Sequence, residues 1–244
     1  MPFDPDTAIG GGDARFPSTR QSLMDVTSAG EALSPEAVGK IVDLYWKPIY
    51  KYIRCKWNKS NEDAKDLTQE FLVRALNRDF FDRFDPQLAS FRTYLRMAVD
   101  RVVLNMLVAL KRQKRGGGVV VTSMDCERVE ALARDRAESP EAAFEREWQR
   151  QLFALAIDDF RGFCELAGKA RQFQIFEQYD LAEGERPSYA KLAEIHGLPV
   201  TTVTNHLAWA RRTLREFVSE RLRGVTSGER ELRAEMRSAF GTKR

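Results

Sequence analysis

The sequence predicts an all-α protein with two small helical domains joined by a flexible linker. Apolar residues recur at intervals of three and four over long stretches, whereas the alternation expected of strands is nearly absent. A Ser-Pro-Glu signature typical of a helix start occurs at 34–36 and again at 139–141. Between these signatures lie three consecutive glycines, 116–118, which disfavour a helix interior. We therefore expect one helical domain on each side of a linker.

These signals divide the 244-residue chain into five segments. Residues 1–33 lack periodicity and are expected to form a flexible leader, and residues 34–112 carry the helices of the first domain. Residues 113–138 form the glycine-rich and acidic linker, and residues 139–223 form the second domain. Residues 224–244 are charged with few apolar side chains, so we expect a charged tail or a frayed helix there.

The composition excludes several classes of protein. Hydrophobic residues make up 43% of the chain, which is enough for packed cores. The longest apolar stretch, 102–110, is shorter than the ~18 residues of a membrane span, and the N-terminus lacks the apolar run of a secretory signal. Three distant cysteines fit a reducing compartment, so we expect a cytoplasmic protein without membrane insertion. Phosphate-loop, zinc-ligand and catalytic-serine motifs do not occur, so we expect no enzyme, cofactor or metal site.

Charge is nearly balanced overall, with a net charge of +3, but it is unevenly distributed along the chain. Residues 92–115 contain seven basic residues and one acid, whereas residues 125–147 contain eight acids and four bases. A basic block followed by an acidic block indicates a local surface for a polyanion.

The stretch from Ser188 to Val203 has the layout of a helix-turn-helix. Gly197 can adopt the left-handed conformation that ends one helix, and Pro199 can start the next. On that second helix the apolar residues form one stripe: Val203, Leu207, Ala210, Leu214 and Phe217. The polar residues on and beside the opposite face are candidates for duplex DNA contact in a major groove: Thr201, Thr204, Asn205, Trp209, Arg211 and Arg212. The alternative is an ordinary helical hairpin with a solvated polar face.

A second candidate site lies on the predicted helix from Glu62 to Leu76. Its apolar residues share one side, which we expect to be buried: Ala64, Leu67, Phe71 and Ala75. The other side presents four polar residues: Asp63, Asp66, Gln69 and Glu70. Acids in a first turn often only complement the helix dipole, which explains Asp63 but not Glu70. We interpret the polar side as a docking surface for a basic partner helix.

Aromatic and arginine residues alternate from Asn77 to Arg96. Rings can stack on unpaired bases while arginines follow the phosphate backbone, so this pattern is typical of a site for single-stranded nucleic acid. We expect Phe91 and Leu95 to be core residues. The candidates for contact with the single strand are Phe84, Ser90, Arg92, Tyr94 and Arg96.

Together, these motifs resemble bacterial RNA polymerase sigma factors of the extracytoplasmic-function (ECF) type. The similar stretches are Asp63 to Leu72, Phe84 to Pro86 with Ser90 to Leu95, and Ser188 to Val203, followed by Ala210, Arg211, Arg212 and Leu214. The Lys-Arg-Gly-Gly-Gly linker at 114–118 and the helix containing Phe144 and Trp148 resemble a subgroup with a glycine-rich linker.

The resemblance implies a function in transcription initiation. It implies that Asp66, Gln69 and Glu70 dock on a coiled coil of the largest subunit of the polymerase core, and that the flap is a further contact. It implies that the first domain captures the melted minus-ten element of promoter DNA and that the second reads the minus-thirty-five element as duplex. An anti-sigma factor or a regulatory kinase is a candidate regulator, and Thr68 is a candidate phosphorylation site.

Two other readings compete with this one. The first is a helix-turn-helix transcriptional regulator that binds DNA independently of the polymerase core. The second is an enzyme in which Asp63, Asp66 and Glu70 ligate magnesium for phosphoryl chemistry, although no partner cluster of acids accompanies them in the sequence.

Overall fold

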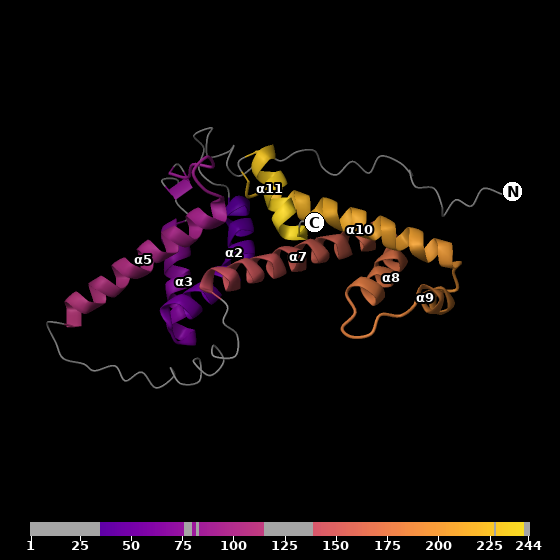
Figure 1. Ribbon diagram of the computed structural model, residues 1–244, viewed down its shortest axis with the longest axis horizontal. Coiled ribbons are helices and arrows are strands. Elements are labelled where there is room, and N and C mark those ends of the chain that lie inside the picture. The colour runs from indigo at the N-terminus through magenta and orange to yellow at the C-terminus, as the bar shows by residue number, and fades with distance from the viewer. Residues whose placement is uncertain (1–34, 76–79, 82, 115–138, 227, 242–244) are drawn as a thin grey trace. The chain divides into compact units, whose positions relative to one another are not determined.

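A computed structural model describes residues 35–75, 80–81, 83–114, 139–226 and 228–241 (Figure 1). Within these ranges the chain forms helices and connecting turns and contains no strand, which confirms the all-helical prediction. The helices are α2 (Pro35–Trp57), α3 (Asn61–Ala75), α5 (Phe91–Lys114), α7 (Pro140–Leu166), α8 (Ala170–Asp180), α9 (Tyr189–His196), α10 (Val200–Arg223) and α11 (Glu229–Phe240). The predicted leader and residues 115–138 of the predicted linker lie outside the described residues, and α5 runs on into the start of that linker. None of the helices described here has the length and apolar character needed to cross a membrane.

The described chain divides into two compact units. We call residues 35–154 and 221–241 the N-terminal unit, and Leu155–Glu220 the C-terminal unit. Helices α7 and α10 each contribute residues to both units. The predicted second domain, 139–223, differs from this division because the first half of α7 belongs with α2, α3 and α5.

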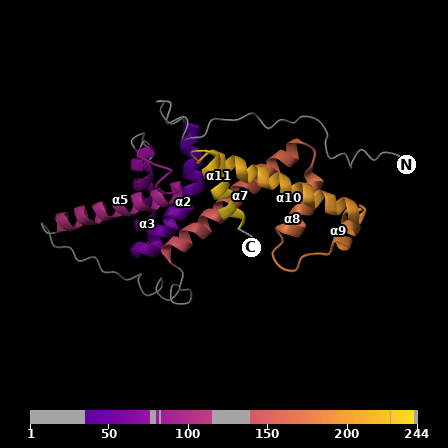
Figure 2. The same ribbon diagram turned by 45° about the horizontal axis from the view of Figure 1, so that its top comes forward.

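Helices α2, α3 and α5 form the centre of the N-terminal unit, with α2 and α3 side by side (Figures 1 and 2). The apolar positions of α2 that recur at helical spacing are buried, including Ile41, Tyr45, Ile49, Tyr52 and Ile53. Phe91 and Leu95 of α5 are each 2% exposed, which confirms their prediction as core residues.

The first half of α7 packs on α2 and α5. Phe144 meets the Tyr52 ring edge-on at 5.9 Å, and Trp148 is fully buried. At the edge of this contact, Lys51 Nζ lies 2.9 Å from a carboxylate oxygen of Glu147. Apolar side chains at positions 144, 148 and 152 lie on one helix face, so burying them requires α2 and α5 as partners. This packing is the physical reason for the difference from the predicted domain boundary.

The segment predicted as a charged tail or a frayed helix forms α11. Its amphipathic pattern buries Leu232, Glu235 and Ala239, and Val225 and Thr226 just before it are also buried. The Phe240 ring meets the Phe153 ring edge-on at 5.3 Å. The low apolar content of the segment gave no sequence signal for these contacts, because only every third or fourth residue of α11 is buried against the rest of the unit.

Helices α8, α9 and α10 form the C-terminal unit together with the end of α7. Of the apolar stripe predicted on α10, Val203, Leu207, Ala210 and Leu214 are buried, and Phe217 is half-buried. Helix α9 begins where Ser188 accepts a hydrogen bond from Lys191 N at 3.1 Å, and it ends at Gly197. There the Leu198 N–H donates to Ala193 O at 2.9 Å, so the chain turns and α10 follows directly.

Gly197 has φ 62° and ψ 38°, a left-handed conformation that side chains with a Cβ disfavour. A Cβ added there would meet no atom within 4 Å, so substitution tests the backbone conformation alone. We expect Gly197→Ala to lower the free energy of unfolding by about 1–2 kcal/mol in urea denaturation.

The matched control is Gly162→Ala in the interior of α7, where an added Cβ also meets nothing. This change should raise stability by ~0.5–1 kcal/mol, because alanine favours the helix. Equal effects of the two substitutions would contradict the role assigned to the turn.

Candidate polymerase and nucleic-acid interfaces

Helix α3 separates its buried and polar sides as predicted. Ser60 caps its start, with Asp63 N donating to Ser60 Oγ at 3.0 Å. The predicted apolar side is buried: Ala64, Leu67, Phe71 and Ala75. Asp63, Asp66 and Gln69 are exposed on the other side, and Glu70 is half-buried and paired with Arg74 one turn later. We call Asp63, Asp66, Gln69 and Glu70 the acidic face.

Thr68 does not lie on the acidic face. Its side chain is fully buried, and its hydroxyl donates to Ala64 O at 2.6 Å within the helix. A kinase could modify this hydroxyl only after local opening of α3. The structure therefore disfavours Thr68 as a phosphorylation site.

Five aromatic rings gather before and at the start of α5. We call them the aromatic cluster: Phe80, Phe81, Phe84, Phe91 and Tyr94. The half-buried Phe84 ring lies 5.4 Å from Phe91 and 5.5 Å from Tyr94, centre to centre. The Tyr94 hydroxyl donates to Phe80 O at 2.7 Å, and burial raises the pKa of Tyr94 against the opposing effects of Arg83 and Arg101. Phe84 and Tyr94 are thus partly exposed, and their rings pack against other rings of the aromatic cluster.

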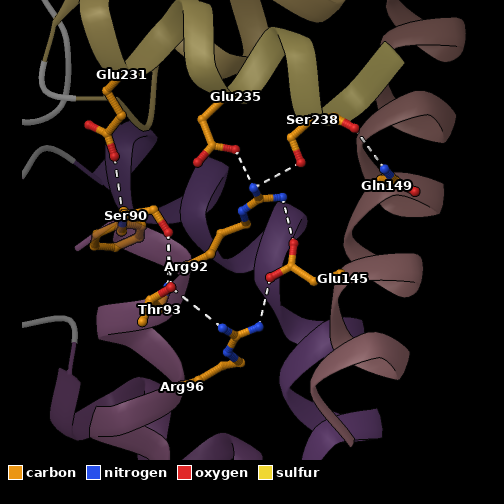
Figure 3. A network of polar contacts seen from close by, with 10 residues as sticks. Ser90, Arg92, Thr93, Arg96, Glu145, Gln149, Glu231, Glu235 and Ser238 are labelled. Carbon is orange, nitrogen blue, oxygen red and sulfur yellow. Dashed lines mark hydrogen bonds and ion pairs between the residues drawn. The ribbon is translucent and has the colours of Figure 1, made fainter. Parts of the chain in front are cut away.

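Arg92 is buried rather than exposed (Figure 3). Its two terminal nitrogens lie 2.8 Å from carboxylate oxygens of Glu145 on α7 and Glu235 on α11. Its guanidinium carbon lies 3.6 Å from the centre of the Trp148 ring. Arg92, which the sequence predicts to meet a single strand, is therefore already paired with two carboxylates within the protein.

Arg96 shares one of these partners. Its Nη1 lies 2.7 Å from the second carboxylate oxygen of Glu145, so one carboxylate bridges two arginines of α5 (Figure 3). Ser90 caps the same helix, because its hydroxyl accepts from Thr93 N at 3.3 Å. We call Arg92, Arg96, Glu145 and Glu235 the arginine cluster. The sequence contained no signal for it, because its acids lie on α7 and α11, far from α5 along the chain.

Burial raises the pKa of Glu235 from 4.5 to about 7, although Arg92 opposes the shift; Glu231 and Glu145 add to it. A raised carboxyl pKa means that folding favours the protonated form. The contribution of protonated Glu235 to the free energy of unfolding is fully present below pH ~4.5 and is lost as pH rises through 7.

We expect wild type to lose up to about 3 kcal/mol of stability relative to Glu235→Gln between pH 4.5 and 8. Glutamine keeps the shape of the side chain but does not titrate. Urea denaturation of both proteins at a series of pH values measures this difference. If the difference in the free energy of unfolding between the two proteins stays constant, or if wild type gains stability as pH rises, the Arg92 ion pair outweighs the effect of burial on Glu235.

The polar face of α10 in the C-terminal unit is largely open. Thr201, Thr204, Asn205 and Arg212 are exposed, as the helical spacing predicts. Arg211 forms two contacts with the Asp180 carboxylate of α8, at 2.8 and 3.0 Å. The hydrogen bonds with Asp180 raise the pKa of Arg211, although partial burial opposes the shift.

Trp209 differs from the exposed residues of this face. Its ring is half-buried, with its centre 5.7 Å from that of Phe160, and Lys169 Nζ lies 5.1 Å from the ring centre. Trp209 and Arg211 therefore also hold α10 to its neighbours, which the sequence pattern did not indicate.

Over the described ranges, no group of three or more His, Cys, Asp or Glu side chains is placed to hold a metal ion. The acids proposed for the magnesium reading, Asp63, Asp66 and Glu70, thus do not converge on one point. Glu70 instead faces Arg74 of its own helix.

Residues 42–115 match the family model described as Sigma-70 region 2. The matched segment includes all of α3 and α5, and hence the acidic face and the arginines of the arginine cluster. The matched segment is less than half of the chain, and it contains the helices that carry two of the candidate interfaces. Comparisons with curated proteins and with solved structures found no match.

Proposed function

We propose that this protein is a cytoplasmic sigma factor of the ECF type that binds RNA polymerase core and directs promoter recognition and melting. The match of residues 42–115 to sigma-70 region 2 carries the proposal. The resemblance to the subgroup with a glycine-rich linker adds the finer classification. The proposal assigns no reaction and no cofactor to the chain.

The acidic face of α3 is the proposed docking surface for the polymerase core. Asp63, Asp66 and Gln69 are exposed on a helix whose opposite side is fixed in the core of the N-terminal unit. Such a rigid acidic surface can bind a basic coiled coil without reorganisation, and complementary charge orients the approach.

The start of α5 is the proposed contact with the melted promoter strand. Phe84 and Tyr94 retain partly exposed rings, and Ser90, Arg92 and Arg96 belong to the same segment of the chain. Opening a base pair costs a few kcal/mol, which stacking on a fixed ring and binding of phosphate by arginine can offset.

In the C-terminal unit, α9 and α10 are proposed as the helix-turn-helix that reads duplex DNA. The exposed side chains near the start of α10 would meet base edges, and Arg212 would meet phosphate or guanine. We expect Arg212→Ala to weaken duplex promoter binding by the holoenzyme about tenfold or more, because a good arginine contact with a base contributes ~1–3 kcal/mol.

The control for this prediction is Arg171→Ala, an exposed arginine of the same unit that lies on α8 rather than on α10. Electrophoretic mobility shift of both holoenzymes on one duplex promoter fragment supplies the comparison. Equal binding by the two variants would mean that the DNA-facing side of α10 is misassigned.

Run-off transcription tests the function as a whole. The purified chain is mixed with RNA polymerase core and a library of promoter fragments, and start sites are mapped by sequencing the transcripts. We expect start sites that core polymerase alone does not use. DNA binding without core and without new start sites would favour the independent helix-turn-helix regulator instead.

A further inference from the structure

Three side chains of α11 reach the start of α5 from one helix face (Figure 3). Glu231 accepts a hydrogen bond from Phe91 N at 3.2 Å, and Glu235 pairs with Arg92 Nη2 at 2.8 Å. The Ser238 hydroxyl accepts from the same arginine nitrogen at 3.2 Å. Spacings of four and three residues place these oxygens on consecutive turns of α11.

The donors that α11 occupies are those that bind phosphate in other settings. A free backbone N–H at a helix N-terminus and an arginine guanidinium both favour a bound anion. In this protein these donors are met by carboxyl oxygens of Glu231 and Glu235. Phe91 and Arg92, which α11 contacts, lie within the segment proposed to meet the single strand.

The contacts of α11 combine these polar pairs with limited apolar burial. Its buried side chains are Leu232, Glu235 and Ala239, so only two of the three are apolar. Phe240 contacts Phe153 but remains 37% exposed. A buried ion pair adds little net stability once the loss of hydration is counted, so such a helix can leave its site at modest cost.

We propose that α11 is an acidic cover that occupies the phosphate-binding donors at the start of α5 and competes with the backbone of single-stranded promoter DNA. The covered chain binds the strand weakly, and release of α11 frees Phe91 N and Arg92 Nη2, while Arg92 Nη1 stays paired with Glu145 of α7. This inference rests on the proposed function for the identity of the competing ligand. The apparent affinity for DNA is reduced by the fraction of chains in which α11 is released.

Glu235→Lys tests the cover directly, because a lysine beside Arg92 repels the helix from its site. Glu229→Lys is the matched control, since it makes the same charge change on the same helix at an exposed position, where Glu229 pairs with Arg233 of α11 itself. Fluorescence anisotropy of a labelled single-stranded DNA oligonucleotide measures the affinity of each full-length protein. We expect Glu235→Lys to bind about tenfold more tightly than Glu229→Lys.

A chain that ends at residue 228 provides a second variant, which retains the buried Val225 and Thr226. It should bind the oligonucleotide as tightly as Glu235→Lys, and adding Arg92→Ala should remove the gain. Circular dichroism confirms that each variant is folded. If neither folded variant binds more tightly than the control, the cover does not exist.

The DNA-binding measurements on the variants and the run-off transcription assay test the cover and the proposed function separately. If wild type directs core polymerase to new start sites but the variants show unchanged affinity, only the cover is refuted. If no variant directs transcription although affinity rises on removal of α11, the cover stands as a competitor for single-stranded DNA and the sigma-factor function fails.

Discussion

Reversing charge on the acidic face is expected to abolish association with RNA polymerase core. The double substitution Asp66→Arg with Glu70→Arg places two positive charges where the proposed basic coiled coil docks. Like charges brought together at an interface cost several kcal/mol, so affinity should fall at least ~100-fold. Co-purification of the chain with core polymerase, followed by run-off transcription, measures both consequences.

The same double variant should remain folded. Asp66 is exposed, and the new arginine at position 70 faces Arg74, a like-charge pair that costs only about 0.5 kcal/mol on a helix. The control is Glu183→Arg with Glu185→Arg, two exposed acids in the loop between α8 and α9. Retention of core binding by the α3 variant would refute the docking assignment, provided that its circular dichroism matches wild type.

Removing the Trp148 side chain should give the largest loss of stability among the changes considered. Trp148 is fully buried in the N-terminal unit, where the Arg92 guanidinium stacks on its ring. Truncation of a buried tryptophan to alanine typically costs about 3–5 kcal/mol, because packing is lost and a cavity remains. The loss of the cation–π contact acts in the same direction. A cost of this size is a large part of the ~5–15 kcal/mol that stabilises a typical domain.

Leu166→Ala on the same helix is the control, because Leu166 is 93% exposed and should change stability by less than ~0.5 kcal/mol. Urea denaturation measures the free energy, and hydrogen exchange locates the effect. Protection should fall in α2 and α5, although Trp148 follows the predicted linker. Loss of protection confined to α8, α9 and α10 would contradict the packing of α7 on the N-terminal unit.

Local sequence pattern was sufficient for much of the fold. Periodicity predicted the helices, and the apolar sides of α3 and α10 are buried as their spacing required. Ser188 and Gly197 marked the ends of α9 because capping and the left-handed turn depend on adjacent residues. The acidic face and the exposed side of α10 followed from the same periodicity, since a helix fixes which side chains share a face.

Helical periodicity did not predict that the arginines of α5 are paired with acids of other helices. Arg92 and Arg96 carry the charge pattern of a nucleic-acid site, yet Glu145 and Glu235 hold them, and these acids come from helices about 50 and 140 residues further along. Trp209 and Arg211 likewise combine exposure with contacts to α7 and α8. The sequence gives the charge of each side chain but not its partner in space.

The sequence by itself determined the helical class, the two motif regions and the faces on which polar side chains gather, because each depends on residues within a few turns of one another. Only the tertiary structure decided that the first half of α7 belongs to the N-terminal unit and that α11 covers the start of α5. Both arrangements bring together residues that are distant in the chain. Burial against these distant partners determines the arrangements, and helical periodicity does not.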